Sequence, residues 1–449
     1  MSRLFGTDGV RGVANTELTP ELAFNLGKVG TYVLRKSKQN PLVLIGKDTR
    51  LSGDLLENAI TSGILSMGGN VVKVGILPTP AIAYLVKHMK ADAGVMISAS
   101  HNTYEFNGIK FFNSEGFKLD DDIEDEIEDI IVRDMDVNIH IEGDRLGRCI
   151  EAMDDGAGRY AEFLKSTIDV SLEGMKLVID CANGAAYRVA EKVFKDLGVQ
   201  VVVMGNTPDG LNINASCGST HPEALQQKVL EEKADVGLAF DGDADRLISV
   251  DEKGRVVDGD KMIYICAKML KEQGKLCGDK VTVTVMSNLG FHKAIQSIGA
   301  KVDVTQVGDR YVLESMLKTG CVIGGEQSGH IIFLDYSTTG DGILTALQLL
   351  KALKHSGRKL SELADEVTVY PQVLKNARIK NENKKKYSSD PVIAEEINRV
   401  EELMAGEGRV LIRPSGTEPL VRVMLEGKDL DVITKLAEGL ATLITKRMG

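Results

Sequence analysis

A plan of strands and helices that occurs three times is the sequence feature that most constrains how this chain can fold. Each copy has an apolar strand, a helix, a glycine, a second strand, and a third strand that runs into a polar loop. The first strands are residues 42–46, 176–180 and 281–285, and the third strands are residues 94–98, 236–240 and 321–324. Strands that alternate with helices are typical of α/β layers, in which right-handed crossovers join parallel strands. The first three quarters of the sequence therefore predict three similar α/β domains.

The last part of the chain follows another plan. After Pro371 the pattern of apolar residues predicts a small α+β domain of strands and two helices. We therefore predict an α/β protein in which three similar domains with mixed or parallel sheets, and a smaller C-terminal α+β domain, are arranged around one central cleft. The expected domains are residues 1–150, 151–254, 255–368 and 369–449.

The third strand of each copy runs into the most polar loop of that copy. These loops are residues 98–102, 241–246 and 325–330. Open α/β sheets bind ligands just beyond the carboxyl ends of their strands. We therefore expect the three loops to occupy equivalent rims and to share one site.

Composition narrows the partners and the compartment. The 449 residues carry a formal net charge of -11, which argues against nucleic acid and anionic membranes because clustered Lys and Arg hold such partners. No apolar run resembles a signal peptide or is long enough to cross a bilayer. The six cysteines are scattered without a Cys-x-x-Cys pair. We expect a cytoplasmic protein with reduced thiols and no nucleic-acid or membrane partner, and the sequence leaves both a monomer and a homodimer open.

Three carboxylates at alternate positions, Asp241, Asp243 and Asp245, follow the apolar strand 236–240. Charges this close repel one another unless a cation lies among them, and oxygen ligands suit a hard ion such as Mg²⁺. The spacing alone also fits an acidic surface turn. An EF-hand is excluded because its sixth loop position is Arg246 instead of glycine, and because the flanks predict strands. Three carboxylates leave an octahedral shell incomplete, so water or a phosphate would complete it.

Ser100 stands just after the strand 94–98 and is followed by His101 and Asn102. Loops of this kind are commonly turns in which hydroxyl groups bond the nearby backbone. A serine hydrolase is disfavoured, because no Gly-x-Ser-x-Gly elbow surrounds Ser100 and the adjacent histidine is poorly placed as its base. A serine that faces a cation held by three aspartates indicates phosphoryl chemistry instead.

Five motifs resemble, in the same order, those of the α-D-phosphohexomutases and, within that family, of the bacterial phosphoglucosamine mutases. They are RLFGTDGVRG at 3–12, SASHN at 98–102, DGDADR at 241–246, GEQSGH at 325–330 and RPSGTEP at 413–419. The resemblance covers essentially the whole chain. It has one departure, Thr103, where the family usually has proline, and this predicts a less rigid loop.

The resemblance implies that Ser100 is the phosphoserine of the active enzyme. Its phosphate would bind one Mg²⁺ together with Asp241, Asp243 and Asp245, and the sequence does not distinguish Mg²⁺ from Mn²⁺. Three carboxylates, a phosphoserine of about -2 and one dication leave a charge of roughly -3, so cations must join them. The residues expected to support this charge are Arg11, Lys110, Arg246 and Asn102. Lys110 is the first candidate for the general base that takes the sugar hydroxyl proton, and His101 is the second.

The two remaining motifs are expected to bind the rest of the substrate. The resemblance implies that the loop 325–330 recognises the sugar through Glu326, Ser328 and His330, and it associates Gln327 with the glucosamine branch. It further implies a distal phosphate clamp in the last domain. An arginine fork, hydroxyl groups and a glycine that lets backbone N–H groups turn toward an anion suit this role. The clamp residues are Arg413, Ser415, Gly416 and Thr417, with Arg422 assisting.

The implied reaction interconverts glucosamine 6-phosphate and glucosamine 1-phosphate through a glucosamine 1,6-bisphosphate intermediate. This isomerase reaction would supply UDP-GlcNAc, an amino-sugar nucleotide and cell-wall precursor. The implied partner is a phosphosugar, and the implied cofactors are Mg²⁺, the bisphosphate and phosphate on Ser100. A phosphomannomutase or phosphoglucomutase with the same machinery is the nearest alternative. A metal-dependent phosphosugar-binding protein or phosphatase, in which Ser100 is never phosphorylated, is the alternative from another class.

Overall fold

A computed structural model describes residues 3–6, 8–133, 135, 137, 141–151, 155–384, 386–404, 406–415 and 418–449. The chain forms two compact units. The first holds the chain up to Met286 together with Ala300–Asp365, and the second holds Ser287–Gly299 and Glu366–Gly449. Among the described residues, no helix is both long enough and apolar enough to cross a membrane.

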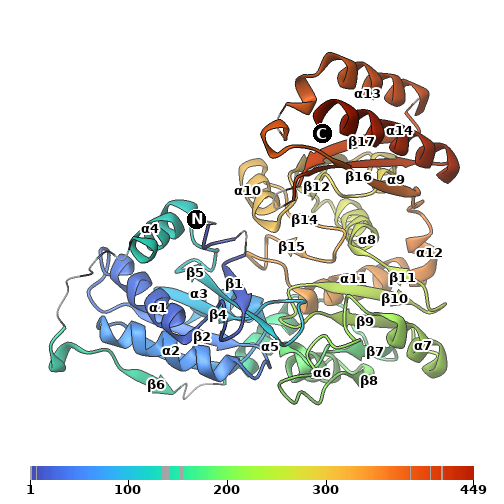
Figure 1. Cartoon of the computed structure of the whole chain (residues 1–449). Helices are drawn as coiled ribbons and strands as arrows, with labels where there is room; N and C mark the ends of the chain where they lie inside the picture. Colours follow the sequence, from blue (N-terminus) through green and yellow to red (C-terminus); the bar gives the residue numbers. More distant parts are fainter. Residues whose placement is uncertain are drawn as a thin grey trace. The chain divides into compact units, whose positions relative to one another are not determined.

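The first sheet of the first unit has six strands in the order β1-β5-β4-β2-β3-β6. These strands are β1 (Val10–Val13), β2 (Leu42–Lys47), β3 (Asn70–Ile76), β4 (Ala93–Ile97), β5 (Phe106–Asn113) and β6 (Cys149–Glu151). Its helices are α1 (Pro20–Leu34), α2 (Gly53–Ser66), α3 (Thr79–His88) and α4 (Asp121–Val132). Figure 1 shows α1 and α2 packed side by side in blue. Leu26, Ile45, Ile60 and Val95 are fully buried in the core that these elements form.

The second sheet has the order β11-β10-β9-β7-β8. Its strands are β7 (Lys176–Asp180), β8 (Gln200–Met204), β9 (Val236–Phe240), β10 (Leu247–Asp251) and β11 (Val256–Val257). The helices in this part of the chain are α5 (Gly156–Ser166), α6 (Val189–Asp196), α7 (Glu223–Glu232) and α8 (Gly259–Glu272). α8 begins where its sequence predicts a cap, since the Asp258 side chain accepts the Lys261 N–H at 3.1 Å.

The third sheet has the order β13-β12-β14-β15. Its strands are β12 (Lys280–Thr284), β13 (Lys301–Thr305), β14 (Ile323–Gly325) and β15 (Ile331–Phe333). The helices that belong with it in the first unit are α10 (Asp309–Thr319), α11 (Gly342–Ser356) and α12 (Leu360–Ala364). α11 is apolar on nearly all sides, which fits its burial along almost its whole length.

Each of these sheets has the same local connection after its central parallel strands. β4, β9 and β14 pair in parallel with β2, β7 and β12, and each is followed by an antiparallel neighbour, β5, β10 or β15. The three polar loops of the sequence are the turns between these antiparallel pairs. The predicted fold class of repeated α/β domains with mixed sheets is therefore confirmed, and the equivalent placement of the loops follows from the repeated topology.

The second unit is an α+β fold built on an antiparallel sheet of order β16-β18-β17. Its elements are β16 (Gln372–Arg378), α13 (Pro391–Met404), β17 (Gly408–Pro414), β18 (Leu420–Gly427), α14 (Leu430–Met448) and α9 (Leu289–Ser297). α9 follows β12 in sequence but belongs to this unit. The Glu426 side chain accepts the Leu289 N–H at 3.0 Å, and the Asn288 amide donates to the Tyr370 carbonyl at 3.0 Å.

Candidate active site

Ser100 lies in the turn between β4 and β5 with its hydroxyl group directed at the aspartate loop. Its Oγ donates a hydrogen bond of 2.6 Å to Asp241 Oδ2, although the turns that hold the two residues connect strands of different sheets. The residue is buried and has a φ of 54°, in the left-handed region that a serine seldom adopts. Its backbone N–H donates to Ser98 Oγ at 3.0 Å. Sequence reasoning predicted that the serine and the aspartates meet, and the structure brings them together.

The turn between β9 and β10 gathers the three aspartates. Asp241, Asp243 and Asp245 are all buried, and one carboxylate oxygen from each lies within 4.8 Å of the others. A glycine at position 242 is needed for the approach of the serine loop, because a Cβ there would lie 2.5 Å from the Ser100 carbonyl oxygen. The acidic surface turn that the spacing also allowed is therefore wrong, since these side chains point into the protein.

The donor set of the aspartate loop fits a divalent cation. Asp243 Oδ1 and Asp245 Oδ1 are buried atoms to which no described residue donates a hydrogen bond. Burial, together with the charges of Asp245 and Asp243, raises the pKa of Asp241 well above its usual range. A cation would satisfy the orphaned oxygens and remove this repulsion, and three hard oxygen donors suit Mg²⁺.

Lys110, on β5, is the cation that the described chain places nearest to this loop. Its Nζ lies 2.8 Å from Asp243 Oδ2, 2.9 Å from Asp8 Oδ2 and 3.6 Å from Asp245 Oδ2. Burial opposes the charged form, but the carboxylates of Asp243, Asp8 and Asp245 raise the pKa of Lys110 above its ordinary value. In this arrangement Lys110 is a cation that donates hydrogen bonds to its carboxylate neighbours. It can act as a base only when those carboxylates bind another partner and no longer stabilise its charge.

His101 and two arginines surround the serine and the aspartates. The Nδ1 of His101 lies 3.4 Å from Ser100 Oγ, and burial, followed by the charges of Arg246 and Arg11, lowers the pKa of His101. Arg11 on β1 donates to the Asp8 carboxylate. The backbone N–H of Arg246 donates to Asp241 Oδ1 at 3.1 Å, and its Nε lies 3.8 Å from Asp245 Oδ1. The structure thus brings His101 and Arg246 into contact with Ser100 and the aspartates, and Arg11 into contact with Asp8.

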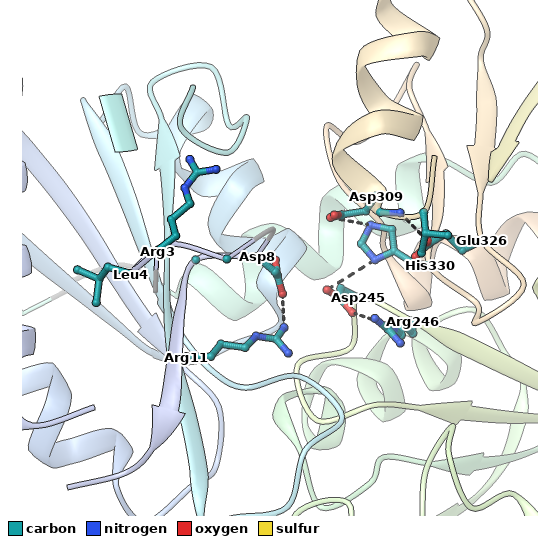
Figure 2. Close-up of a pocket in the computed structure, with 13 residues that line it drawn as sticks. Arg3, Leu4, Asp8, Arg11, Asp245, Arg246, Asp309, Glu326 and His330 are labelled. Carbon is teal, nitrogen blue, oxygen red and sulfur yellow. Dashed lines mark hydrogen bonds and ion pairs between the residues drawn. The ribbon is translucent and has the colours of Figure 1, made fainter. Parts of the chain in front are cut away.

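The turn between β14 and β15 brings His330 to the same centre. Its Nδ1 lies 3.6 Å from Asp245 Oδ2 and its Nε2 lies 3.6 Å from Asp309 Oδ2 (Figure 2). Burial opposes protonation, but Asp245 and Asp309 raise the pKa of His330. Glu326 accepts the Gly308 N–H at 3.2 Å. Ser328 is exposed, and it is not among the residues that line the cavity described next.

A cavity of about 480 Å³ opens beside these groups (Figure 2). Its lining mixes both signs of charge and comes from all three sheets of the first unit. The predicted site residues that line it are Arg11, Asp245, Arg246, Glu326 and His330. Such a lining suits a small, strongly polar ligand that carries an anionic group and hydroxyl groups. Gln327 is directed elsewhere, because its amide donates to Asp258 Oδ2 at 3.1 Å.

The predicted phosphate clamp lies in the second unit. Arg413 on β17 is the cross-strand partner of Arg422 on β18, and burial, together with the charge of Arg422, lowers the pKa of Arg413. Ser415 Oγ accepts the Glu418 N–H at 3.2 Å. Gly416 and Thr417 lie outside the described residues. Like charges directly opposite on a sheet are unfavourable, so the pair of arginines favours an anion beside them.

Sequence reasoning missed several residues of the centre. Lys118 bonds both Asp8 and Asp309, and it thereby joins the first sheet to the N-terminus of α10. Arg50 and Asn214 bond the backbone of the serine loop. Arg50 had a signal, because Asp48-Thr49-Arg50 directly follows an apolar strand, at the sheet edge where ligand loops were expected. The positions of Lys118 and Asn214 are set by tertiary packing, and no signal in the sequence indicated them.

Comparison with known protein families covers most of the chain. The family models of phosphoglucomutase/phosphomannomutase match in four parts. They are α/β/α domain I at residues 2–137, domain II at 158–254, domain III at 258–370 and the C-terminal domain at 374–443.

Relatives and solved structures agree with these matches. The chain is 57% identical over 449 residues to the phosphoglucosamine mutase of Alkaliphilus oremlandii and 58% identical over 450 residues to that of Caldicellulosiruptor bescii, with 100% of each chain covered. Its fold is similar to that of a phosphoglucomutase/phosphomannomutase family protein from Burkholderia thailandensis, with a TM-score of 0.82, 24% identity and 99% and 98% of the two chains covered. It is also similar to Aspergillus fumigatus N-acetylphosphoglucosamine mutase in complex with GlcNAc-6P and magnesium, with a TM-score of 0.70, 19% identity and 99% and 96% covered. With matches along its whole length, the chain belongs to the phosphoglucomutase/phosphomannomutase family and, within it, to the phosphoglucosamine mutases.

Proposed function

We propose that this protein interconverts glucosamine 6-phosphate and glucosamine 1-phosphate, and that Ser100 carries the phosphate that is transferred. The observation that carries the proposal is the 2.6 Å hydrogen bond between Ser100 Oγ and Asp241, which places a hydroxyl group against three buried carboxylates. The full-length relatives named phosphoglucosamine mutase support the choice of substrate.

The first half of the reaction moves a phosphoryl group from Ser100 to the free hydroxyl of the sugar phosphate. The P–O bond to Ser100 Oγ breaks as the sugar oxygen bonds phosphorus, which gives glucosamine 1,6-bisphosphate and a free serine. The sugar hydroxyl proton passes to a base, for which Lys110 and His101 are the candidates, and the departing Ser100 Oγ takes up a proton to become a hydroxyl group. In the second half, Ser100 Oγ takes the other phosphate of the bisphosphate and releases the isomeric product.

The chain's own groups provide the charge balance for this transfer. Arg11, Lys110 and Arg246 surround the position where negative charge develops on the phosphoryl oxygens. Asp241, Asp243 and Asp245, with the phosphate on Ser100, would hold Mg²⁺, which supplies charge stabilisation as a Lewis acid when bound. Glu326 and His330 would orient the sugar, and Ser328 would complete this set.

The arginine pair of the second unit is proposed to bind the phosphate that is not reacting. Arg413 and Arg422, with Ser415, Gly416 and Thr417, would form charge-assisted hydrogen bonds to a dianion. We further propose that the protein works in the cytoplasm. All six cysteines are unpaired, which fits a reducing compartment.

Intact-mass measurement tests the phosphoserine. We expect a form of the purified protein that is heavier by one phosphate, and this form should disappear with activity in Ser100→Ala. Ser114→Ala, which changes an exposed serine in the turn after β5, is the matched control and should keep both. An active protein in which Ser100 never carries phosphate would overturn the proposal in favour of a phosphatase or a binding protein.

A substrate panel tests the sugar. The phosphates of glucosamine, glucose and mannose should be compared with and without a trace of the corresponding bisphosphate. We expect the largest kcat/KM for glucosamine phosphate and stimulation of the reaction by bisphosphate. Equal turnover of all three sugars would leave a phosphohexomutase without the proposed specificity.

A further inference from the structure

Arg50 stands directly after β2, and its guanidinium group is enclosed by the backbone of the serine loop. Nη2 donates to the carbonyls of Ser100 at 3.0 Å and Asn102 at 2.8 Å. Nη1 donates to the carbonyls of Phe106, at 3.0 Å, and Thr103. The side chain is completely buried, so water does not compete for these bonds.

The fifth donor of the guanidinium group fixes its own orientation. Nε donates to Asp48 Oδ2 at 2.8 Å, and the same oxygen accepts the hydroxyl of Ser98 at 2.6 Å. Ser98 Oγ in turn accepts the N–H of Ser100. A guanidinium group has five N–H donors in a rigid plane, and here each has one acceptor. Only arginine offers this set of donors.

A second side chain, from the part of the chain that carries the second sheet, bonds the same loop. The Nδ2 of Asn214, which follows β8 in the chain, donates to the carbonyls of Ser100 at 2.9 Å and Asn102 at 2.8 Å. Arg50 and Asn214 therefore share two acceptors, the carbonyl oxygens of Ser100 and Asn102. Each of these oxygens accepts one bond from each side chain. The loop is held at the left-handed φ of Ser100 by these bonds to its backbone.

These anchors differ from the hydrogen bond of the serine side chain in one respect. Once Ser100 Oγ carries a phosphate it has no proton to donate, so its bond to Asp241 is lost and repulsion replaces it. Bonds to carbonyl oxygens do not change with the state of Oγ. The geometry points to Arg50 and Asn214 as positioning residues that keep the Ser100 backbone in one place whether or not the serine carries phosphate.

This inference rests on the proposed phosphoserine function, and the anchored loop includes Thr103. The carbonyl of Thr103 is one of the four that Arg50 bonds. The backbone at Thr103 is therefore held by a tertiary contact. Neither anchor contacts the side chains that react. Removing an anchor should therefore slow the chemical step while substrate binding persists.

The test compares Arg50→Lys and Arg50→Met by steady-state kinetics and by hydrogen exchange of residues 98–107. A lysine keeps the charge beside Asp48 but has three donors at one point. If charge alone mattered, lysine would restore activity. We expect both variants to lose kcat by roughly 100-fold, the usual effect of a misplacement near 1 Å, with KM changed by less than about threefold and faster exchange in the loop.

Asn214→Gly is the second variant, because glycine accepts the φ of 56° at this position and leaves the Asp48–Arg50 pair intact. We expect it to lose kcat by roughly 10-fold, again without a matching change in KM. Lys47→Met is the matched control. Lys47 lies three residues before Arg50, and this variant breaks its partly buried ion pair with Glu57, away from the serine loop. The variant should keep its kcat.

Three results separate the possible failures. If Ser100 carries phosphate and the folded Arg50→Lys and Asn214→Gly variants turn over at the rate of the unmodified protein, the positioning role is overturned while the proposed function stands. If both variants lose kcat only in proportion to the loss of folded protein, the anchors are merely structural. If the active protein never carries phosphate on Ser100, the proposed function fails first.

Discussion

Two arginine-containing regions, one in each unit, differ in how their charges are compensated. In the first unit, Arg11, Lys110, Lys118 and Arg246 each face at least one buried or half-buried carboxylate. In the second unit, Arg413 is the cross-strand partner of Arg422, and among the described residues only the Glu418 carboxylate forms an ion pair with either arginine, 3.7 Å from Arg422. The first region is nearly balanced before any ligand arrives, whereas the second has an excess of positive charge.

This difference indicates a division of labour. A centre at which charge moves during the reaction needs groups of both signs fixed in advance, since reorganisation costs activation free energy. A group that only attaches a dianion needs unpaired donors. Changes in the first region should therefore act mainly on kcat and changes in the second mainly on KM.

The largest expected effect comes from Asp243→Asn. Loss of this carboxylate weakens the proposed metal site and removes a partner of Lys110, so we expect kcat to fall on the order of 10³-fold with a small change in KM. Asp251→Asn is the control, because Asp251 is equally buried at the end of β10 but bonds Arg255 outside the site. Comparable losses of kcat in the two variants would contradict the proposal that the first region carries out the chemical step.

The next effect concerns Arg413→Gln and Arg422→Gln. Each removes a charge-assisted bond to the proposed phosphate, so we expect KM to rise roughly 10- to 100-fold, with kcat within about threefold of the unmodified protein. Arg399→Gln, which changes an exposed arginine on α13, should change neither. A fall in kcat at constant KM would show that the second region takes part in the chemical step.

Metal binding should distinguish the two regions without any activity measurement. If Mg²⁺ binds at Asp241, Asp243 and Asp245, a 100-fold excess over its Kd stabilises the first unit by about 2.7 kcal/mol. Hydrogen exchange with Mg²⁺ or with EDTA should show protection of β9 and β10 and no change in β17 and β18. Asp243→Asn should lose this protection, and equal protection of both units would contradict the proposed site.

The smallest expected effect is that of acid on stability, which should change in opposite directions in the two units. Burial and the charge of Arg409 lower the pKa of His292 to about 4, so its contribution to stability is present above about pH 6.5 and is lost as the pH falls toward 4. In the first unit, burial raises the pKa of Asp341 to about 6, so acidification through this range relieves a cost. We expect the second unit to lose about 1 kcal/mol between pH 7 and pH 5, allowing for the partial exposure of His292. Exchange rates of β17 at both pH values measure this, and His292→Gln should abolish the difference.

Much of this arrangement follows from patterns that are local in sequence. The apolar strands, their glycines and the polar loops after them were enough to predict three equivalent rims, and Ser100 and Asp241 meet as expected. The strand after the aspartate loop was expected, but β5 and β15 were not predicted, because their residues show no clear alternation of apolar and polar side chains.

The parts that escaped prediction depend on contacts between distant segments. Asn214 reaches the serine loop from a position more than a hundred residues away, and Lys118 and Asp309 meet only in the folded chain. No spacing rule connects such residues. The likeness of Gln327 to the glucosamine branch was a local signal, yet its amide bonds Asp258 instead of lining the cavity.

The assignment of α9 to the second unit has a consequence for biosynthesis. Leu289 leaves the ribosome well before Glu426, the residue whose carboxylate accepts its N–H. The helix must therefore wait, without its final partner, while the remainder of the chain is translated. A fragment that starts at Glu366 would lack this helix, so the second unit should mature only after synthesis is nearly complete, and it should not be recovered intact from the C-terminal sequence by itself.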